Sequence, residues 1–89
     1  MKKYELAIQN HDKAIELKPN DAVLYSLRGF DYYFSKKYEL AIKDFNKYIE
    51  LAPNDADGYK MRGFCYQQLG DEAKAQSDFK KAKELGDKN

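Results

Sequence analysis

The chain has 89 residues, of which 43% are hydrophobic and 35% are charged, a size and composition typical of one small domain. Sixteen Lys and Arg residues against fifteen Asp and Glu residues give a net charge of +1, which excludes the broad cationic surface that nucleic acids and anionic membranes attract. No apolar run approaches the roughly 18–20 residues needed to cross a bilayer, so we expect neither a membrane span nor a signal peptide. The single cysteine, Cys65, excludes an internal disulfide, favours a reducing compartment and predicts a cytoplasmic protein.

The first two predicted helices are separated by a turn at Pro19. Proline ends the first helix, and Asp21 offers a side-chain acceptor to the unpaired amides that open the second. In the second helix Tyr25 and Tyr32 share one side, yet apolar residues also cover the opposite side. An amphipathic helix needs only one buried stripe, so the second stripe indicates a neighbouring helix or a partner.

The three later helices follow the same plan. Pro53 and Asp55 mark the turn between the third and fourth helices, and Gly70 with Asp71 forms a turn and a cap between the last two. No segment alternates with a period of two, so we predict no strand. The predicted helices span residues 4–17, 22–34, 38–51, 56–69 and 72–85.

An internal repeat of 34 residues organises the chain. Shifting the sequence by 34 residues places KKYELAI at 2–8 on KKYELAI at 36–42, and 26 of the 55 aligned pairs are identical. Random pairing would give about 3–4 identities at typical residue frequencies. Each 34-residue unit is therefore predicted to form one helical hairpin that stacks on its neighbours.

These residues make the repeat similar to the tetratricopeptide repeat, whose pattern of aromatic, glycine, tyrosine, alanine, aromatic and proline residues occurs here twice. The matching residues are Tyr25, Gly29, Tyr32, Ala41, Phe45 and Pro53, followed by Tyr59, Gly63, Tyr66, Ala75 and Phe79. Arg28 and Arg62 depart from the pattern where it has leucine, and Asp87 where it has proline. The resemblance implies an all-α helix–turn–helix solenoid of five helices in one domain, 1–89, with a half-repeat at 1–21 and full repeats at 22–55 and 56–89.

The two arginines stand at the same position of successive repeats. Each is followed sixteen residues later by an aspartate beside a core aromatic, so we predict the pairs Arg28–Asp44 and Arg62–Asp78. As partly exposed pairs they would contribute about 0–1 kcal/mol each. The glycine after each arginine is predicted at a close helix crossing, where an added side chain would overpack the core.

Residues that carry enzyme chemistry are sparse. His11 is the only histidine and stands where the later repeats have a core aromatic, so we expect it to be an exposed substitute. Cys65 lies between two aromatic residues and is predicted to be a small packed residue. One Cys and one His cannot supply a four-ligand zinc site, and no glycine-rich phosphate loop occurs. We therefore predict a non-enzymatic chain with no catalytic residue, no metal and no cofactor.

The remaining candidate for a functional site is a binding surface on the first helix of each repeat. In the tetratricopeptide repeat family the first helices line a concave face that holds a peptide, so the resemblance implies a protein-interaction module. A basic cluster that clamps a terminal carboxylate in one family variant is missing here, because only Lys60 is basic on this face, and an apolar or aromatic segment is the expected partner. The implied peptide-binding residues are Val23, Ser26, Leu27, Phe30, Tyr33, Phe34, Lys60, Met61, Phe64, Gln67 and Gln68.

Two alternatives stay open at the level of sequence. In one, Phe30 and Phe64 pack on each other between the two first helices, which leaves only the end of the face for a partner. In the other, the apolar face or the incomplete N-terminal unit joins copies of the chain into a homo-oligomer.

Overall fold

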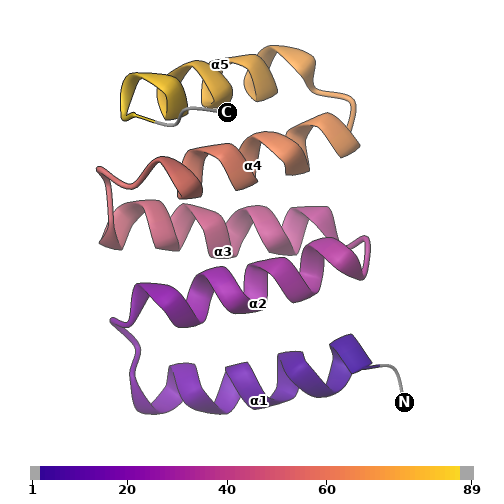
Figure 1. The fold of residues 1–89 in the computed structure, drawn as a ribbon. Coiled ribbons are helices and arrows are strands. Elements are labelled where there is room, and N and C mark those ends of the chain that lie inside the picture. Colours follow the sequence, from indigo (N-terminus) through magenta and orange to yellow (C-terminus); the bar gives the residue numbers. More distant parts are fainter. Residues whose placement is uncertain (1–2, 87–89) are drawn as a thin grey trace.

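The computed structural model describes residues 3–86, which form five α-helices joined by short turns. Each helix packs against the next one in the chain, so the helices stack in sequence order from one end of the molecule to the other (Figure 1). The predicted boundaries agree with the structure to within one residue, and the all-α fold is confirmed. The helices are α1 (Lys3–Leu17), α2 (Ala22–Phe34), α3 (Tyr38–Leu51), α4 (Ala56–Gln68) and α5 (Glu72–Glu84).

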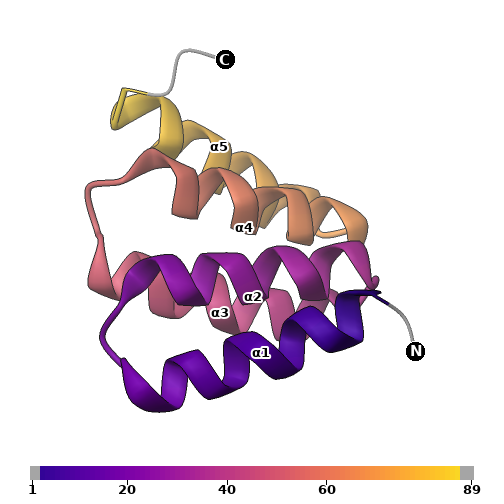
Figure 2. The same ribbon diagram turned by 60° about the horizontal axis from the view of Figure 1, so that its bottom comes forward.

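The hairpins α2–α3 and α4–α5 repeat the same arrangement. In Figure 2, α2 and α4 lie toward the viewer, in front of α3 and α5. α1 packs on α2 as α3 packs on α4, so α1 occupies the place of a second helix. Residues 87–89, which end the last predicted repeat and include Asp87, lie outside the described residues.

Side-chain caps define where three of the helices begin. Asp21, Asp55 and Asp71 each accept a hydrogen bond from a backbone amide two or three residues ahead, at 3.0–3.1 Å. These bonds satisfy amides that have no partner inside the helix. The caps predicted at these three positions are therefore confirmed.

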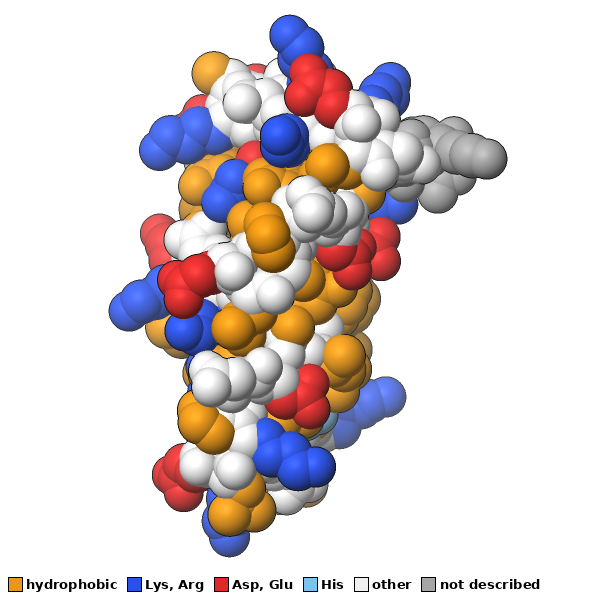
Figure 3. All heavy atoms as spheres, turned by 90° about the vertical axis from the view of Figure 1, so that its left-hand side faces the viewer, with side chains coloured by type: hydrophobic (Ala, Val, Ile, Leu, Met, Phe, Trp, Pro, Cys, Tyr) orange, Lys and Arg blue, Asp and Glu red, His pale blue; other side chains and the backbone are white. Residues whose placement is uncertain are grey.

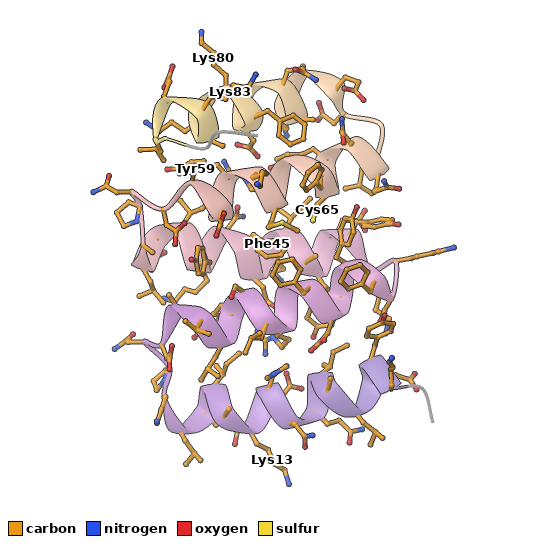
Figure 4. The ribbon with its side chains drawn as sticks, in the orientation of Figure 1. Lys13, Phe45, Tyr59, Cys65, Lys80 and Lys83 are labelled. Atoms are coloured by element: carbon orange, nitrogen blue, oxygen red, sulfur yellow. The ribbon has the colours of Figure 1, made fainter. Side chains whose placement is uncertain are left out.

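The centre of the core lies between α2, α3 and α4. Ala41, Phe45 and Cys65 are completely buried there, and Figure 4 shows Phe45 and Cys65 beside each other. A Cβ atom built on Gly29 would lie 2.9 Å from the Phe45 ring. Real Cβ atoms do not approach a ring so closely, so a glycine is needed at this crossing, as predicted.

The same close approach occurs one repeat later. A Cβ atom on Gly63 would lie 2.7 Å from the ring of Phe79. The two hairpins therefore pack through the same glycine-on-phenylalanine contact, which explains why both residues recur at a spacing of 34.

Both predicted arginine–aspartate pairs are present. Arg28 donates two hydrogen bonds to Asp44 at 2.9 and 2.7 Å, and Arg62 donates two to Asp78 at 2.8 and 2.7 Å. The expectation of partly exposed pairs is wrong for the carboxylates, because Asp44 is only 4% exposed and Asp78 only 5%. Asp44 precedes the buried Phe45 in the sequence, and Asp78 precedes the half-buried Phe79.

Each arginine also has a partner that the sequence did not reveal. Arg28 donates a third hydrogen bond to Asp12 of α1 at 2.8 Å, and Arg62 donates one to Asn46 of α3 at 2.9 Å. These acceptors precede their arginines by sixteen residues. Each arginine thus bridges two successive second helices.

His11 is not the exposed residue that the sequence suggested. Its side chain is 24% exposed, and its Nδ1 lies 2.7 Å from the Asp31 carboxylate. Asp31 stands one repeat before Cys65, just as His11 stands one repeat before Phe45. The first layer therefore uses a polar pair where the next layer uses an aromatic ring and a thiol.

Within residues 3–86, none of the helices is long and apolar enough to span a bilayer. The same part of the chain holds no group of three or more His, Cys, Asp or Glu side chains that could bind a metal ion.

Candidate functional site

The predicted binding residues all lie on α2 and α4, which lie in front of α3 and α5 in Figure 2. Val23, Leu27 and Phe34 are 57%, 41% and 55% exposed, so α2 presents three large apolar side chains to solvent. Gln67 and Gln68 are also exposed. The half-buried members are Ser26, Phe30, Tyr33, Lys60, Met61 and Phe64.

A cavity of about 210 Å³ lies between α2, α3 and α4. Ser26 and Phe30 line it from α2 and Met61 lines it from α4, so the fold brings three predicted site residues together. Its complete lining is Ser26, Phe30, Phe45, Tyr48, Asp57, Gly58 and Met61. A small, mostly apolar hollow of this kind suits one large side chain of a partner.

Hydrophobic side chains gather in the middle of the neighbouring surface. Figure 3 shows the side of the stack on which α2 and α4 begin, and hydrophobic side chains run through its centre with Lys, Arg, Asp and Glu side chains interspersed and around them. An apolar strip flanked by polar groups is the usual composition of a protein-interaction surface.

Among the described residues, no ring contact joins Phe30 to Phe64, so the structure does not support the first alternative. The Phe30 ring lies 5.7 Å from Phe45 and 6.4 Å from Phe34, whereas the Phe64 ring lies 5.2 Å from Phe79. Each phenylalanine thus packs inside its own hairpin. The space between the two first helices is left for the cavity.

The other end of the face is an aromatic cluster. Phe34 stacks on Tyr4 of α1 at 5.9 Å and meets Tyr33 edge to face at 5.4 Å. Tyr4 was not among the predicted residues, because its contact with Phe34 joins segments thirty residues apart.

Sequence reasoning also missed the lining that comes from the second helix. Phe45 and Tyr48 of α3 were not among the predicted site residues, yet both line the cavity. The sequence does carry one signal for this part of the lining: Gly58 stands where the preceding repeat has Leu24. A Cβ atom on Gly58 would lie 2.8 Å from Tyr48 and from Ile49, so glycine lets α4 approach α3 at this point.

Two acidic residues set the electrostatics of the cavity. Tyr48 donates its hydroxyl hydrogen bond to the Asp55 carboxylate, and Asp57 lines the opening. Burial, followed by the bond to Asp55 and the charges of Asp55 and Asp57, raises the pKa of Tyr48 to about 12. The phenol is therefore neutral at physiological pH, and the local field is negative.

The arrangement offers little chemistry for catalysis. Burial raises the pKa of the Cys65 thiol to about 12, so the thiol is protonated and shielded rather than nucleophilic. The arginine pKa values are raised, chiefly by hydrogen bonds to Asp44 and Asp78, which keeps both side chains charged and structural.

Two family profiles, both described as tetratricopeptide repeat, match residues 22–55 and 45–77. The chain belongs to the tetratricopeptide repeat family. Members of the family are typically protein–protein interaction modules and are usually non-catalytic. No curated protein has a significant sequence match to the chain.

Solved structures of other tetratricopeptide repeat proteins share the whole arrangement. The first such domain of Spaghetti (RPAP3), bound to the HSP90 peptide SRMEEVD, is 29% identical with a TM-score of 0.92, over 98% of this chain and 69% of that one. MamA from AMB-1 is 30% identical, with a TM-score of 0.90 over 93% and 49% of the two chains. MamA from Desulfovibrio magneticus RS-1 is 28% identical, with a TM-score of 0.90 over 93% and 47%. The chain thus spans about half the length of the MamA chains that it matches.

Proposed function

We propose that the chain is a non-catalytic module that binds an extended or helical segment of a partner protein across α2 and α4. Its single domain, residues 1–89, consists of a half-repeat at 1–21 followed by full repeats at 22–55 and 56–89. The observation that carries the proposal is the cavity between α2, α3 and α4, together with the exposed Val23 and Leu27 on the helix that supplies Ser26 and Phe30 to its lining. Exposed apolar side chains beside a hollow are what a partner segment would cover.

The partner is an apolar or aromatic segment. The HSP90 peptide bound to the Spaghetti domain, SRMEEVD, is acidic at its C-terminal end. The corresponding face here has one basic residue, Lys60, while the other members of the predicted site are apolar or uncharged. Burial of apolar area therefore supplies the attraction, and the short groove limits affinity to roughly the micromolar range.

Substitution of the exposed apolar residues tests this function. Val23→Ser with Leu27→Ser should abolish selection of peptides from a random displayed library, because the apolar strip is lost while both side chains lie outside the core. Leu40→Ser is the matched control, since Leu40 is 42% exposed but lies on α3. Equal selection by the double variant and the wild type would contradict the proposal.

Phe30 is unsuitable for that test. Its ring packs edge to face on the buried Phe45, so Phe30→Ser would weaken the core as well as the face. Circular dichroism melts of the Val23, Leu27 and Leu40 variants should instead be nearly the same as that of the wild type.

Self-association through α1 is the second candidate. Leu6 and Leu17 are exposed on α1 and, at a spacing of eleven residues, share one side of the helix. Lys13 projects from the outer side of α1 in Figure 4, which disfavours a dry interface there. Sedimentation velocity across a concentration series tests it, and a stable dimer that Leu17→Asp dissociates would establish it.

A further inference from the structure

The cavity between α2, α3 and α4 has an apolar interior and one charged residue at its opening. Phe30, Phe45, Tyr48 and Met61 supply the apolar surface, and Asp57 is the only charged residue of the lining. Lys60, the basic residue of the same face, does not line the cavity. A side chain that enters would therefore meet aromatic and thioether groups along its length and a carboxylate near the surface.

The Asp57 carboxylate is available to a partner. Asp57 is exposed, and among the described residues its side chain makes no hydrogen bond or ion pair. Asp55 differs, because its oxygens accept hydrogen bonds from the Tyr48 hydroxyl and from the Asp57 amide. Asp55 thus holds Tyr48 in place and adds negative charge, while Asp57 keeps its acceptor capacity.

The chain itself shows what such surroundings hold. The Arg62 guanidinium lies 5.6 Å from the Tyr59 ring and 6.0 Å from the Tyr66 ring, and it donates two hydrogen bonds to Asp78. Aromatic rings attract the cation, and a carboxylate matches the planar fork of donors. The cavity offers the same two components with no arginine of its own among the lining residues.

We propose that this cavity receives an arginine side chain of the partner segment. The inference rests on the proposed function of the face and adds the charge and identity of one anchor residue. The methylene stem would lie against Phe30 and Met61, and the guanidinium would donate its paired hydrogen bonds to Asp57. Lysine would fit less well, because its ammonium group is a strongly hydrated point charge that cannot bond a carboxylate through two parallel donors.

Selection from a random twelve-residue displayed library tests the inference with the intact 89-residue chain. The wild type should select apolar peptides that share one arginine. Asp57→Asn should still select apolar peptides but lose the preference for arginine. Glu72→Gln is the matched control, because both acids lie in the first turn of a helix and Glu72 is outside the cavity, so its selected peptides should resemble those of the wild type.

Synthetic versions of a selected peptide then isolate the charge. Replacing its arginine with citrulline keeps the shape and removes the charge, and we expect roughly fivefold weaker binding to the wild type. Binding to Asp57→Asn should be equal for the two peptides. Apolar peptides without an arginine preference, or a preference that survives in Asp57→Asn, would overturn the inference and leave the proposed function intact. If the wild type selects no peptide, the proposed function fails and the inference fails with it.

Discussion

Arg62 holds the nearly buried carboxylate of Asp78 through two hydrogen bonds of 2.8 and 2.7 Å. The bonds come from one planar guanidinium, so the pair is bidentate. A buried carboxylate without such a partner would keep most of its desolvation cost. The hairpin α4–α5 therefore depends on this contact more than a surface ion pair would suggest.

Removing one partner of this pair should be costly. We expect Arg62→Ala to lower the free energy of unfolding by roughly 3 kcal/mol, because the Asp78 charge stays buried without a partner. The double variant Arg62→Ala with Asp78→Ala should regain part of that loss. Urea unfolding measures both, and Lys47→Ala is the control, since its bond to Glu50 lies on the surface and its loss should change the free energy of unfolding far less. A double variant no more stable than Arg62→Ala would contradict this account.

We expect Gly63 to tolerate no side chain as long as residue 79 is phenylalanine. A Cβ atom would lie 2.7 Å from that ring, so we expect Gly63→Ala to lower the free energy of unfolding by about 1–3 kcal/mol. Phe79→Leu removes the clashing ring, so the two substitutions together should cost less than the sum of their separate effects. A thermal double-mutant cycle gives the coupling energy, and additive effects would show that the steric account is wrong.

Lys36 and Gly70 occupy the same turn position of successive repeats, and both have positive φ, at 64° and 82°. Left-handed backbone is strained for a residue with a Cβ atom and unstrained for glycine. We expect Lys36→Gly to raise the free energy of unfolding by about 0.5–1 kcal/mol and Gly70→Ala to lower it by about 1 kcal/mol. Apart from the neighbouring residues in the chain, no atom lies within 4 Å of a Cβ at Gly70, so the second effect is conformational rather than a clash. Urea unfolding of both variants checks the prediction, which fails if Lys36→Gly is the less stable protein.

The buried thiol of Cys65 should make the fold sensitive to alkali. Burial raises its pKa from 9.0 to about 12, so above pH 9 the unfolded chain binds fewer protons at this site than the folded chain. The stabilisation is thus complete below pH 9 and is lost as pH rises toward 12, by up to about 1.4 kcal/mol per pH unit. Cys65→Ala should lose stability less steeply over this window in pH-dependent urea unfolding. Tyr48 titrates in the same pH range in both the wild type and Cys65→Ala, so only the difference between their stability–pH slopes reports the thiol. Identical slopes would refute the prediction.

Much of the fold could be predicted because the 34-residue repeat allows the chain to be aligned with itself. Pro19 and Pro53, the capping aspartates and the recurring glycines are local signals, and local geometry decides helix ends. The arginine–aspartate pairs could be predicted because both partners recur with the same spacing of sixteen residues. Their burial could not, since the exposure of Asp44 and Asp78 depends on how the hairpins close over them.

The sequence by itself determined the five helices, the 34-residue period and the two helices that present the candidate face. The tertiary structure decided where the hollow lies, because Phe45 and Tyr48 reach it only after α4 approaches α3 at Gly58. It also decided the contacts of Tyr4 with Phe34 and of Asp12 with Arg28, which join different helices. Periodicity places a residue on a side of its own helix, but only packing between helices determines what that side meets.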